Sequence, residues 1–283
     1  MERIANMILW ISGIGWAAAL CLVSVRVFVC DQFVVPSTSM EPTLTVGDRI
    51  LANKLLFGAR IYTSFEFGED IPLESWRMPR LRRIKPNDIV VFNAPHGFDR
   101  NRIEFKINYV YVKRCVGTPG DTISIRNGRF HNSEYASPIG DTAQQRLLAS
   151  IPDSMLSRGV MQAYPNDEEY FGWTIKNSGP LYVPRKGDSI EMNARNRRLY
   201  GIITEYETGC DASRIDGYYT FRENYYFLCG DNVIDSKDSR YLGFVPEEFI
   251  IGMVNRISYS RNPYTNKIRP NRIWKKVNDN HDE

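Results

Sequence analysis

The residues best suited to chemistry lie in the segment Pro36–Leu44, which reads PSTSMEPTL. Two prolines restrict the backbone of this hydroxyl-rich run, and this stiffens the turn that carries it. A serine hydroxyl becomes a good nucleophile only when a neighbouring group accepts its proton. A Ser/Thr-rich linker is the alternative. The string GDRILANK, which begins at Gly47, argues against a linker because it predicts a turn and a strand.

Common motifs of metal, nucleotide and histidine-based chemistry are absent from the sequence. None of the three histidines (His96, His131 and His281) stands beside a candidate nucleophile. The chain has no H-E-x-x-H, G-x-S-x-G, P-loop or dinucleotide glycine motif. Its five cysteines show no C-x-x-C spacing, which would indicate a zinc site or a redox pair. We therefore expect no cofactor and no metal.

Composition and charge exclude several protein classes. The chain has 283 residues with 36 Lys and Arg against 33 Asp and Glu, a net charge of +3 that does not favour nucleic acid as a partner. Hydrophobic residues make up 43% and charged residues 24%, an ordinary globular composition. It excludes a disordered chain, a collagen-like fibre and a polytopic membrane protein. The many Tyr, Phe, Gly and Pro residues favour strands and turns over a helical bundle.

The N-terminal segment predicts a membrane anchor. No charge occurs between Arg3 and Arg26, and these 22 residues would span roughly 33 Å as a helix, enough for a hydrocarbon core of about 30 Å. A cleaved signal peptide is the alternative, since Ala17–Ala19 offers small residues. However, the apolar run is longer than a usual signal core and its cationic start is short. We predict a single anchor over residues 1–30, whose orientation the charges do not determine.

After residue 30, short apolar runs alternate with turn residues, as is typical of antiparallel β structure. Residues 108–113 and 225–229 are predicted strands, and Asn127-Gly128 is a strong signal for a two-residue hairpin. One turn pattern recurs four times, each time with a Gly-Asp or Asn-Asp pair before a strand. The four strings are VGDRI from residue 46, PNDIV from 86, PGDTI from 119 and KGDSI from 186.

Two later segments are harder to interpret. Residues 129–180 are polar, with a possible short helix at 144–148. The stretch 261–276 mixes Arg and Lys with Ile268, Ile273 and Trp274. It is either an exposed tail or a segment that lies near an anionic membrane surface.

Four strings in a fixed order resemble the motifs of bacterial type I signal peptidase (leader peptidase), a serine protease family with a Ser–Lys dyad. They are PSTSMEPTL, GDRILANK, YVKRCVGTPGDTI and GDNVIDSKDSRYLGFVPEEFIIGMV, behind an N-terminal anchor. Together they cover about 60 residues between Pro36 and Val254. The sequence departs from the usual family pattern at Val233, which replaces arginine, and at Asp235, which replaces asparagine.

The resemblance assigns roles to four residues. Ser39 matches the nucleophile and Lys113 the general base. Ser37 matches the serine whose hydroxyl forms the oxyanion hole with the backbone N–H of Ser39. Ser236 matches the serine that hydrogen-bonds the lysine amine and orients it.

The resemblance also implies supporting residues and a substrate-binding surface. Asp238 with Arg240, and Asp231 with Arg114, match ion pairs that are structural and near the site. A further set matches positions that line shallow pockets for two small substrate side chains. These positions are Phe33, Val35, Pro36, Met40, Leu44, Tyr111 and Val112.

The proposed base obeys a simple physical requirement. A lysine amine with a pKa of about 10.4 must fall to roughly 8 or below to accept a proton near neutral pH. This shift costs about 2.7 kcal/mol, which burial among apolar groups can supply. Lys113 follows Tyr-Val-Tyr-Val on a predicted strand, where Arg114 would point to the opposite face. We expect Asp235 to face outward, since an inward carboxylate would raise the lysine pKa.

The resemblance implies a mostly β fold with an antiparallel β catalytic core over residues 31–128 and 225–260. A smaller β-rich domain would be inserted at 129–224, one transmembrane helix would precede the core, and a basic tail would follow at 261–283. The implied activity is removal of signal peptides after a small-x-small (Ala-x-Ala) motif on the extracytoplasmic face of the plasma (inner) membrane. The implied partners are exported pre-proteins and the lipid bilayer.

Two other functions are compatible with parts of the sequence. A self-cleaving repressor uses the same scaffold, but this chain has an anchor where such a protein has a DNA-binding head. A non-catalytic, membrane-tethered β module that binds secreted chains is the alternative from another class. The joint presence of all four matched residues, Ser37, Ser39, Lys113 and Ser236, argues against it.

Overall fold

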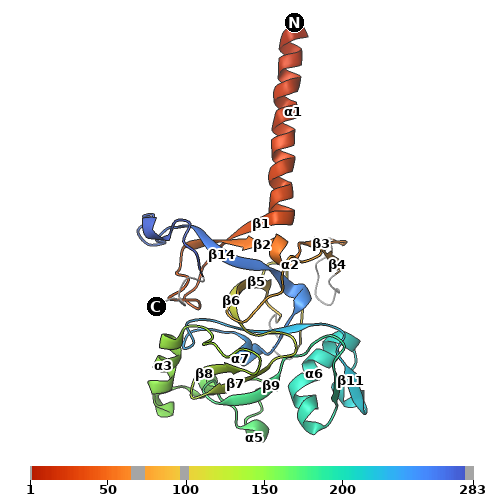
Figure 1. Ribbon diagram of the computed structural model, residues 1–283, viewed down its shortest axis with the longest axis vertical. Helices are drawn as coiled ribbons and strands as arrows, with labels where there is room; N and C mark the ends of the chain where they lie inside the picture. Colours follow the sequence, from red (N-terminus) through yellow and green to blue (C-terminus); the bar gives the residue numbers. More distant parts are fainter. Residues whose placement is uncertain (1, 65–73, 96–101, 278–283) are drawn as a thin grey trace.

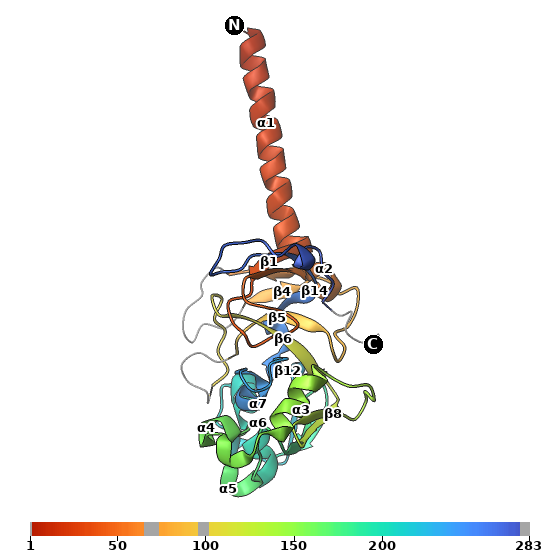
Figure 2. The same ribbon diagram turned by 90° about the vertical axis from the view of Figure 1, so that its left-hand side faces the viewer.

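The computed structural model describes residues 2–64, 74–95 and 102–277. Its first helix, α1 (Glu2–Ser24), continues as a π-helical turn, η1 (Val25–Val29), and stands clear of the rest of the protein (Figures 1 and 2). Within the described residues it is the one helix long and apolar enough to cross a membrane, and none of its apolar window is buried. The prediction of one apolar N-terminal helix is confirmed.

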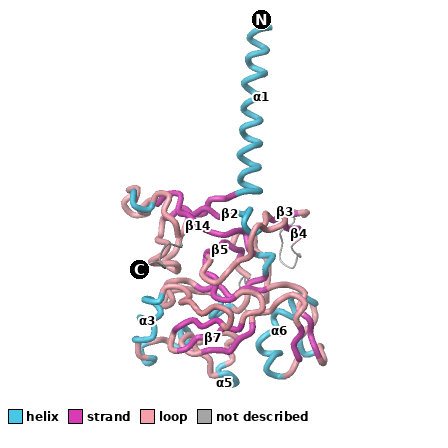
Figure 3. The backbone as a smooth tube through the Cα atoms, viewed as in Figure 1, coloured by secondary structure: helices cyan, strands magenta, loops and turns pink. Residues whose placement is uncertain are grey.

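A central antiparallel sheet follows the helix (Figures 1 and 3). Among the described residues its strands have the order β1-β2-β14-β5-β6-β12-β13. The late strand β14 lies between β2 and β5, and β12 pairs with β6, so segments distant in sequence share one sheet. The strands are β1 (Cys30–Val34), β2 (Asp48–Asn53), β5 (Ile89–Asn93), β6 (Val110–Gly117), β12 (Tyr225–Cys229), β13 (Val245–Pro246) and β14 (Ile250–Ser260).

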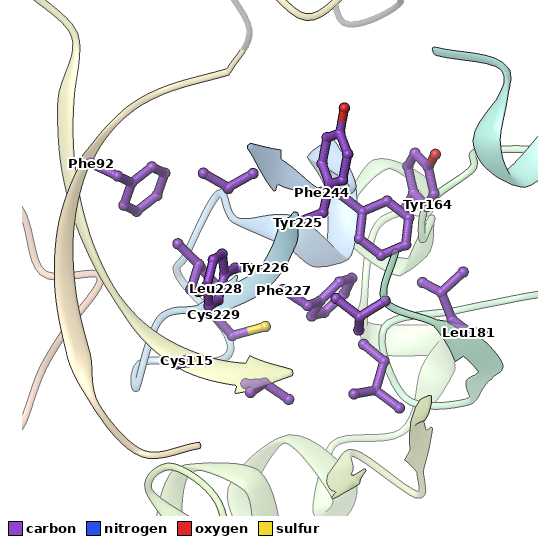
Figure 4. Packing of buried hydrophobic residues seen from close by; sticks show 14 of the residues in the cluster. Phe92, Cys115, Tyr164, Leu181, Tyr225, Tyr226, Phe227, Leu228, Cys229 and Phe244 are labelled. Atoms are coloured by element: carbon purple, nitrogen blue, oxygen red, sulfur yellow. The ribbon is translucent and has the colours of Figure 1, made fainter. Parts of the chain in front are cut away.

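The two faces of the sheet pack against different hydrophobic cores. Side chains alternate between the faces of a strand. Along β5, Val90 and Phe92 therefore join a large core that includes residues from 129–224, the inserted segment. Figure 4 shows part of this core. Ile89 and Val91 join a smaller core on the other face.

The four recurring turns have the same backbone conformation. The turns span residues 45–48, 85–88, 118–121 and 185–188. The third residue of each turn has a positive φ angle: Gly47 (92°), Asn87 (74°), Gly120 (98°) and Gly187 (87°). In each turn the next residue, an aspartate, donates its N–H to the carbonyl three positions earlier, at 3.0–3.1 Å. A type II turn requires this positive φ, which glycine and asparagine tolerate best. The strands β2, β5, β7 and β10 follow these turns, which confirms the prediction.

The predicted hairpin is also confirmed. Asn127 (φ 48°) and Gly128 (φ 74°) join β7 (Thr122–Arg126) to β8 (Arg129–Asn132), and two positive φ values indicate a type I′ turn. β9 (Ser178–Tyr182) pairs with the other edge of β7. The described residues also form two separate two-stranded antiparallel sheets. They are β3 (Arg60–Tyr62) with β4 (Ser75–Arg77), and β10 (Ser189–Glu191) with β11 (Tyr218–Thr220).

The inserted segment contains more helix than we predicted. Helix α3 (Thr142–Ser150) includes the expected short helix, but α6 (Ala194–Thr208) was not anticipated. The side chain of Asn193 caps the start of α6 and Gly209 ends it with a φ of 70°. The shorter helices are α2 (Lys54–Phe57), α4 (Arg158–Met161), α5 (Glu168–Phe171) and α7 (Ser239–Leu242), with 3₁₀ turns at 153–155, 212–214, 247–249 and 270–272.

The basic C-terminal segment is hydrogen-bonded to the sheet over its described part, which ends at residue 277, but most of its side chains are exposed, among them Ile268, Ile273 and Trp274. Ile257 N–H donates to Lys275 O at 2.8 Å, and Arg272 forms an ion pair with Asp48 at 2.5 Å. Asp48 is fully buried, and its need for a cationic partner explains why the segment folds back. His96 and His281 lie outside the described residues.

Candidate active site

The nucleophile candidate lies on a turn that the small aliphatic core supports. β1 runs directly into this turn, where Glu41 N–H donates to Thr38 O at 2.9 Å and Leu44 N–H donates to Met40 O at 2.8 Å. The side chains of Met40 and Leu44 are fully buried beneath it. Hydrogen bonds and buried side chains on both sides of Ser39 therefore fix the backbone that carries it.

Lys113 extends from the middle of β6 toward this turn. Its Nζ lies 2.5 Å from Ser39 Oγ, and the residue is only 5% exposed. Burial lowers the pKa of the amine below its ordinary value, against an opposing attraction from Asp238. An uncharged amine at this distance can accept the hydroxyl proton, so the pair can generate a nucleophilic alkoxide.

Two further hydroxyls flank Ser39. Ser37 Oγ lies 3.3 Å from Ser39 Oγ and is exposed to solvent. Thr38 Oγ1 donates to Asp235 Oδ2 at 2.6 Å. Asp235 is exposed to solvent, but its carboxylate turns toward the segment that carries Ser39.

The loop after β12 closes over the nucleophile turn. Asn232 N–H donates to Ser39 O at 3.2 Å, and its side-chain amide donates to Thr38 O at 3.3 Å. A Cβ atom at Gly230 would lie 2.4 Å from Ser39 O and 2.2 Å from Ser236 Oγ. Only glycine permits this close approach of the two segments.

Ser236 does not make the hydrogen bond that the resemblance implies. Its hydroxyl is buried and has no hydrogen-bond partner among the described residues, while the Lys113 amine contacts Ser39. The side chain packs against the backbone at Gly230 instead. The expected orienting contact is therefore absent from this conformation.

Two buried ion pairs hold the loop in place, as the resemblance implies. Arg114 binds both carboxylate oxygens of Asp231 at 2.6 Å and donates to Asn87 O at 2.9 Å. Arg240 binds both oxygens of Asp238 at 2.8 and 2.9 Å.

The Asp238–Arg240 pair also brings a carboxylate close to Lys113. Burial of Asp238 opposes ionisation, yet the Arg240 guanidinium and the Gly230 N–H hold the pKa of its carboxyl below the usual value. Asp238 is therefore a permanent negative charge close to Lys113.

A pocket of about 410 Å³ opens beside Ser39 and Lys113. Four of the residues predicted to bind substrate line it, namely Phe33, Pro36, Tyr111 and Val112. The remaining lining residues are Val34, Ser37, Thr38, Ser39, Ile50, Val91, Val110, Lys113, Asp235 and Lys237.

Three predicted pocket residues are misplaced. Val35, Met40 and Leu44 are not among the residues that line the pocket, and their buried side chains pack in the small core. Their apolar character serves packing below the turn, and the prediction of a pocket role is wrong.

Sequence reasoning missed Ile50 and Val91, which line the pocket because of strand register. Ile50 pairs with Phe33 across β1 and β2, and Val91 pairs with Val112 across β5 and β6. The alternating pattern of each strand was readable, but the pairing between strands was not. Within the described residues, no group of three His, Cys, Asp or Glu side chains is placed to hold a metal ion.

Comparisons with known proteins agree on one family. Residues 7–259 match the family described as signal peptidase, peptidase S26. Signal peptidase I of Buchnera aphidicola subsp. Schizaphis graminum is 30% identical over 272 residues, covering 88% of this chain and 75% of that protein. Signal peptidase I of Rickettsia bellii is 28% identical over 276 residues, covering 89% and 80%.

Among solved structures, a signal peptidase I from Enterococcus faecalis matches with 17% identity and a TM-score of 0.31, over 61% of this chain and 97% of that one. This weak structural likeness carries no argument, whereas the family match spans most of the chain. The chain belongs to the signal peptidase family, peptidase S26.

Proposed function

We propose that this protein is a membrane-anchored serine endopeptidase that removes signal peptides from exported pre-proteins, with Ser39 as nucleophile and Lys113 as general base. The observation that carries the proposal is the distance of 2.5 Å between Lys113 Nζ and Ser39 Oγ, at a buried amine whose pKa is lowered by burial. The names of the similar proteins support the same substrate class.

The chemistry follows from this pair. Neutral Lys113 takes the proton from Ser39 Oγ as the oxygen attacks the carbonyl carbon of the scissile peptide bond. The Ser37 hydroxyl and the Ser39 N–H donate to the oxyanion that forms. The intermediate collapses as the Lys113 ammonium protonates the departing amine, which leaves an ester on Ser39. Lys113 then takes a proton from a water molecule as its oxygen attacks the ester, and returns that proton to Ser39 Oγ as the acyl group leaves. This step restores the serine hydroxyl and the neutral amine, and the released acid loses its proton to solvent.

The site must stabilise the lysine while it carries the proton. The nearby Asp238 carboxylate favours the ammonium form by its charge. The Lys113 Nζ also lies 5.8 Å from the centre of the Tyr111 ring, within cation–π range. Burial therefore favours the neutral amine, and these two groups limit the cost of its transient charge.

The pocket suits an extended peptide with small side chains near the scissile bond. Ile50, Val91 and Tyr111 occupy its walls with bulky groups, which favours an Ala-x-Ala motif over larger residues. β1 is a terminal strand of the main sheet in the described residues and leads directly to Ser39. An extended substrate can add to such an edge by backbone hydrogen bonds.

The apolar helix supports a location of the site close to a membrane. We assign α1 to the plasma (inner) membrane and the catalytic part to its extracytoplasmic face, where pre-proteins emerge. At the junction, Lys54 Nζ donates to Arg26 O at 2.8 Å, and Arg26 pairs with Asp31 at 2.9 Å. These contacts connect the end of the anchor to the sheet only a few residues before Ser39.

The test is processing of a purified pre-protein by the full chain in detergent micelles. Ser39→Ala and Lys113→Ala are expected to lower the cleavage rate by about 10³-fold or more, because each removes one half of the reacting pair. Ser189→Ala and Lys186→Ala, at exposed positions of the inserted segment, are matched controls that retain wild-type rates. If both site variants still cleave, the dyad assignment is wrong. If the wild type binds the pre-protein without cleaving it, the protein is a binding module.

A further inference from the structure

The hydrogen bond between Thr38 and Asp235 links the nucleophile turn to a loop nearly 200 residues away. Its length of 2.6 Å is typical of a hydroxyl that donates to a carboxylate. Thr38 lies between the two serines that the proposed reaction uses.

The acceptor is held in a fixed position. Asp235 N–H donates to Asn232 O at 3.1 Å and approaches the Asn232 side-chain oxygen at 3.3 Å, which closes a turn over residues 232–235. The buried ion pairs of Asp231 and Asp238 flank this turn on both sides. A carboxylate on such a turn can restrain whatever donates to it.

The donor transmits this restraint to Ser39. Threonine is branched at Cβ and has few χ1 rotamers, so fixing its hydroxyl restricts the backbone that carries it. Asn232 holds the Thr38 and Ser39 carbonyls from the same side. Release of Thr38 Oγ1 would leave the contacts of Asn232 with the Thr38 and Ser39 carbonyls to hold the turn on this side.

A direct electrostatic action of Asp235 on the base is not supported by the arrangement. The charges that chiefly influence the Lys113 amine are Asp238, Arg240 and Asp231. The Asp235 carboxylate is instead exposed and turned toward Thr38.

We infer that Asp235 is a positioning residue that acts through the Thr38 hydroxyl to hold Ser39 in line with Lys113. This inference rests on the proposed function. It predicts that the two side chains act as one unit, that an amide oxygen in place of the carboxylate suffices, and that the effect lies in the chemical step and not in substrate binding.

The experiment measures kcat and KM of the full-length protein in detergent with a pre-protein substrate. Thr38→Val and Asp235→Ala are each expected to lower kcat about tenfold with KM within about twofold of wild type. The double variant should lose the same tenfold and not a hundredfold, because the second change removes nothing more. Thr38→Ser and Asp235→Asn, which keep a donor and an acceptor, should restore kcat to within about threefold of wild type.

A matched control is Thr220→Val, which removes the exposed hydrogen bond of 2.7 Å between Ser189 and Thr220 in the inserted segment and should leave both constants unchanged. Multiplicative loss in the Thr38 and Asp235 double variant, a change in KM alone, or wild-type kcat in Asp235→Ala would overturn the inference. Failure of the wild type itself to cleave would instead refute the proposed function.

Discussion

The two hydrophobic cores on either side of the main sheet differ in composition. The core below the nucleophile turn is aliphatic, with buried members such as Met40, Leu44 and Ile89. The large core toward the inserted segment is rich in aromatic rings, among them Tyr225 and Phe244 (Figure 4). Lys113 pairs directly with Val90 of the large core, whereas the turn that carries Ser39 lies on the aliphatic core, so the two regions meet at the candidate site.

The two regions also differ in whether their buried hydroxyl groups have hydrogen-bond partners. Near the inserted segment, Tyr219 and Tyr225 donate to Glu207 at 2.5 and 2.9 Å, and Tyr226 donates to Glu247 at 3.1 Å. Near the nucleophile, the Ser236 hydroxyl has no partner among the described residues. Satisfied networks stabilise a fold, whereas incompletely satisfied groups are often found where a reaction supplies further atoms.

Outside the proposed Ser39–Lys113 pair, the largest expected effect on activity is that of a methyl group between the two active-site segments. Gly230→Ala should lower cleavage by about 100-fold or more, because its Cβ would displace Ser39 or Ser236 from distances of 2.4 and 2.2 Å. The matched variant Gly159→Ala, in a helix of the inserted segment, meets no atom within 4 Å and should retain full activity. Equal rates for the two variants would show that the loop tolerates movement.

The next largest expected difference is in the free energy of unfolding, between loss of a buried ion pair near the site and loss of an exposed one in the inserted segment. Asp238→Asn should lower the free energy of unfolding by about 3–5 kcal/mol, since it leaves the fully buried Arg240 without a counter-charge. Glu168→Gln removes an ion pair with Arg158 in the inserted segment, where both side chains are more than half exposed. That change should cost at most about 1 kcal/mol in chemical denaturation. A small loss for Asp238→Asn would mean that the site loop does not depend on its buried pairs.

Local features of the fold were predictable from the sequence because they depend on neighbouring residues. The Asn127-Gly128 hairpin and the recurring Asp turns need a residue that tolerates positive φ, and such residues are visible in the string itself. The apolar helix at the N-terminus is equally local. Helix α6 escaped prediction because its buried face, including Leu199 and Ile203, is set by packing against the large core.

The site was predictable only through resemblance. Lys113 and Ser39 are 74 positions apart, and no periodicity brings them together. The pocket residues Ile50 and Val91 depend on strand register, and the fully buried Met40 could not be told from a pocket residue by its apolar type. These contacts depend on how strands distant in the sequence pair with one another, and a single sequence does not specify that pairing.

Replacement of Lys113, the proposed base, should separate activity from stability. In the folded protein the pKa of Lys113 lies below its ordinary value of 10.5 because of burial. The unfolded state therefore binds more protons between the two values, and the contribution of this residue to stability rises with pH across that window. Lys113→Met should be inactive yet more stable by about 1–3 kcal/mol at neutral pH, with a gain that fades toward pH 10.5. Thermal unfolding at several pH values measures this, and a gain independent of pH would contradict a lowered pKa.

The same amine should shape the activity profile of the wild type. Its protonation below the folded pKa removes the base, so kcat/KM should fall on the acid side with a single ionisation. A rate that stays flat from neutral pH down to pH 5 would exclude Lys113 as the base.

The smallest expected effect on stability concerns two buried serines of the same loop. Ser236→Ala removes a hydroxyl without a hydrogen-bond partner, so the free energy of unfolding should change by less than about 0.5 kcal/mol. Ser239→Ala removes the hydroxyl that accepts from Leu228 N–H at 3.0 Å and should cost about 1–2 kcal/mol.

Activity should show the opposite order. We expect cleavage by Ser236→Ala to fall about tenfold, because rotation of this hydroxyl toward the Lys113 amine would orient the base once Ser39 has lost its proton. Ser239→Ala should retain most of its activity at temperatures where it is folded. If Ser236→Ala loses stability but keeps its rate, the hydroxyl is a packing group, and the contrast between a satisfied core and an unsatisfied site no longer holds at this position.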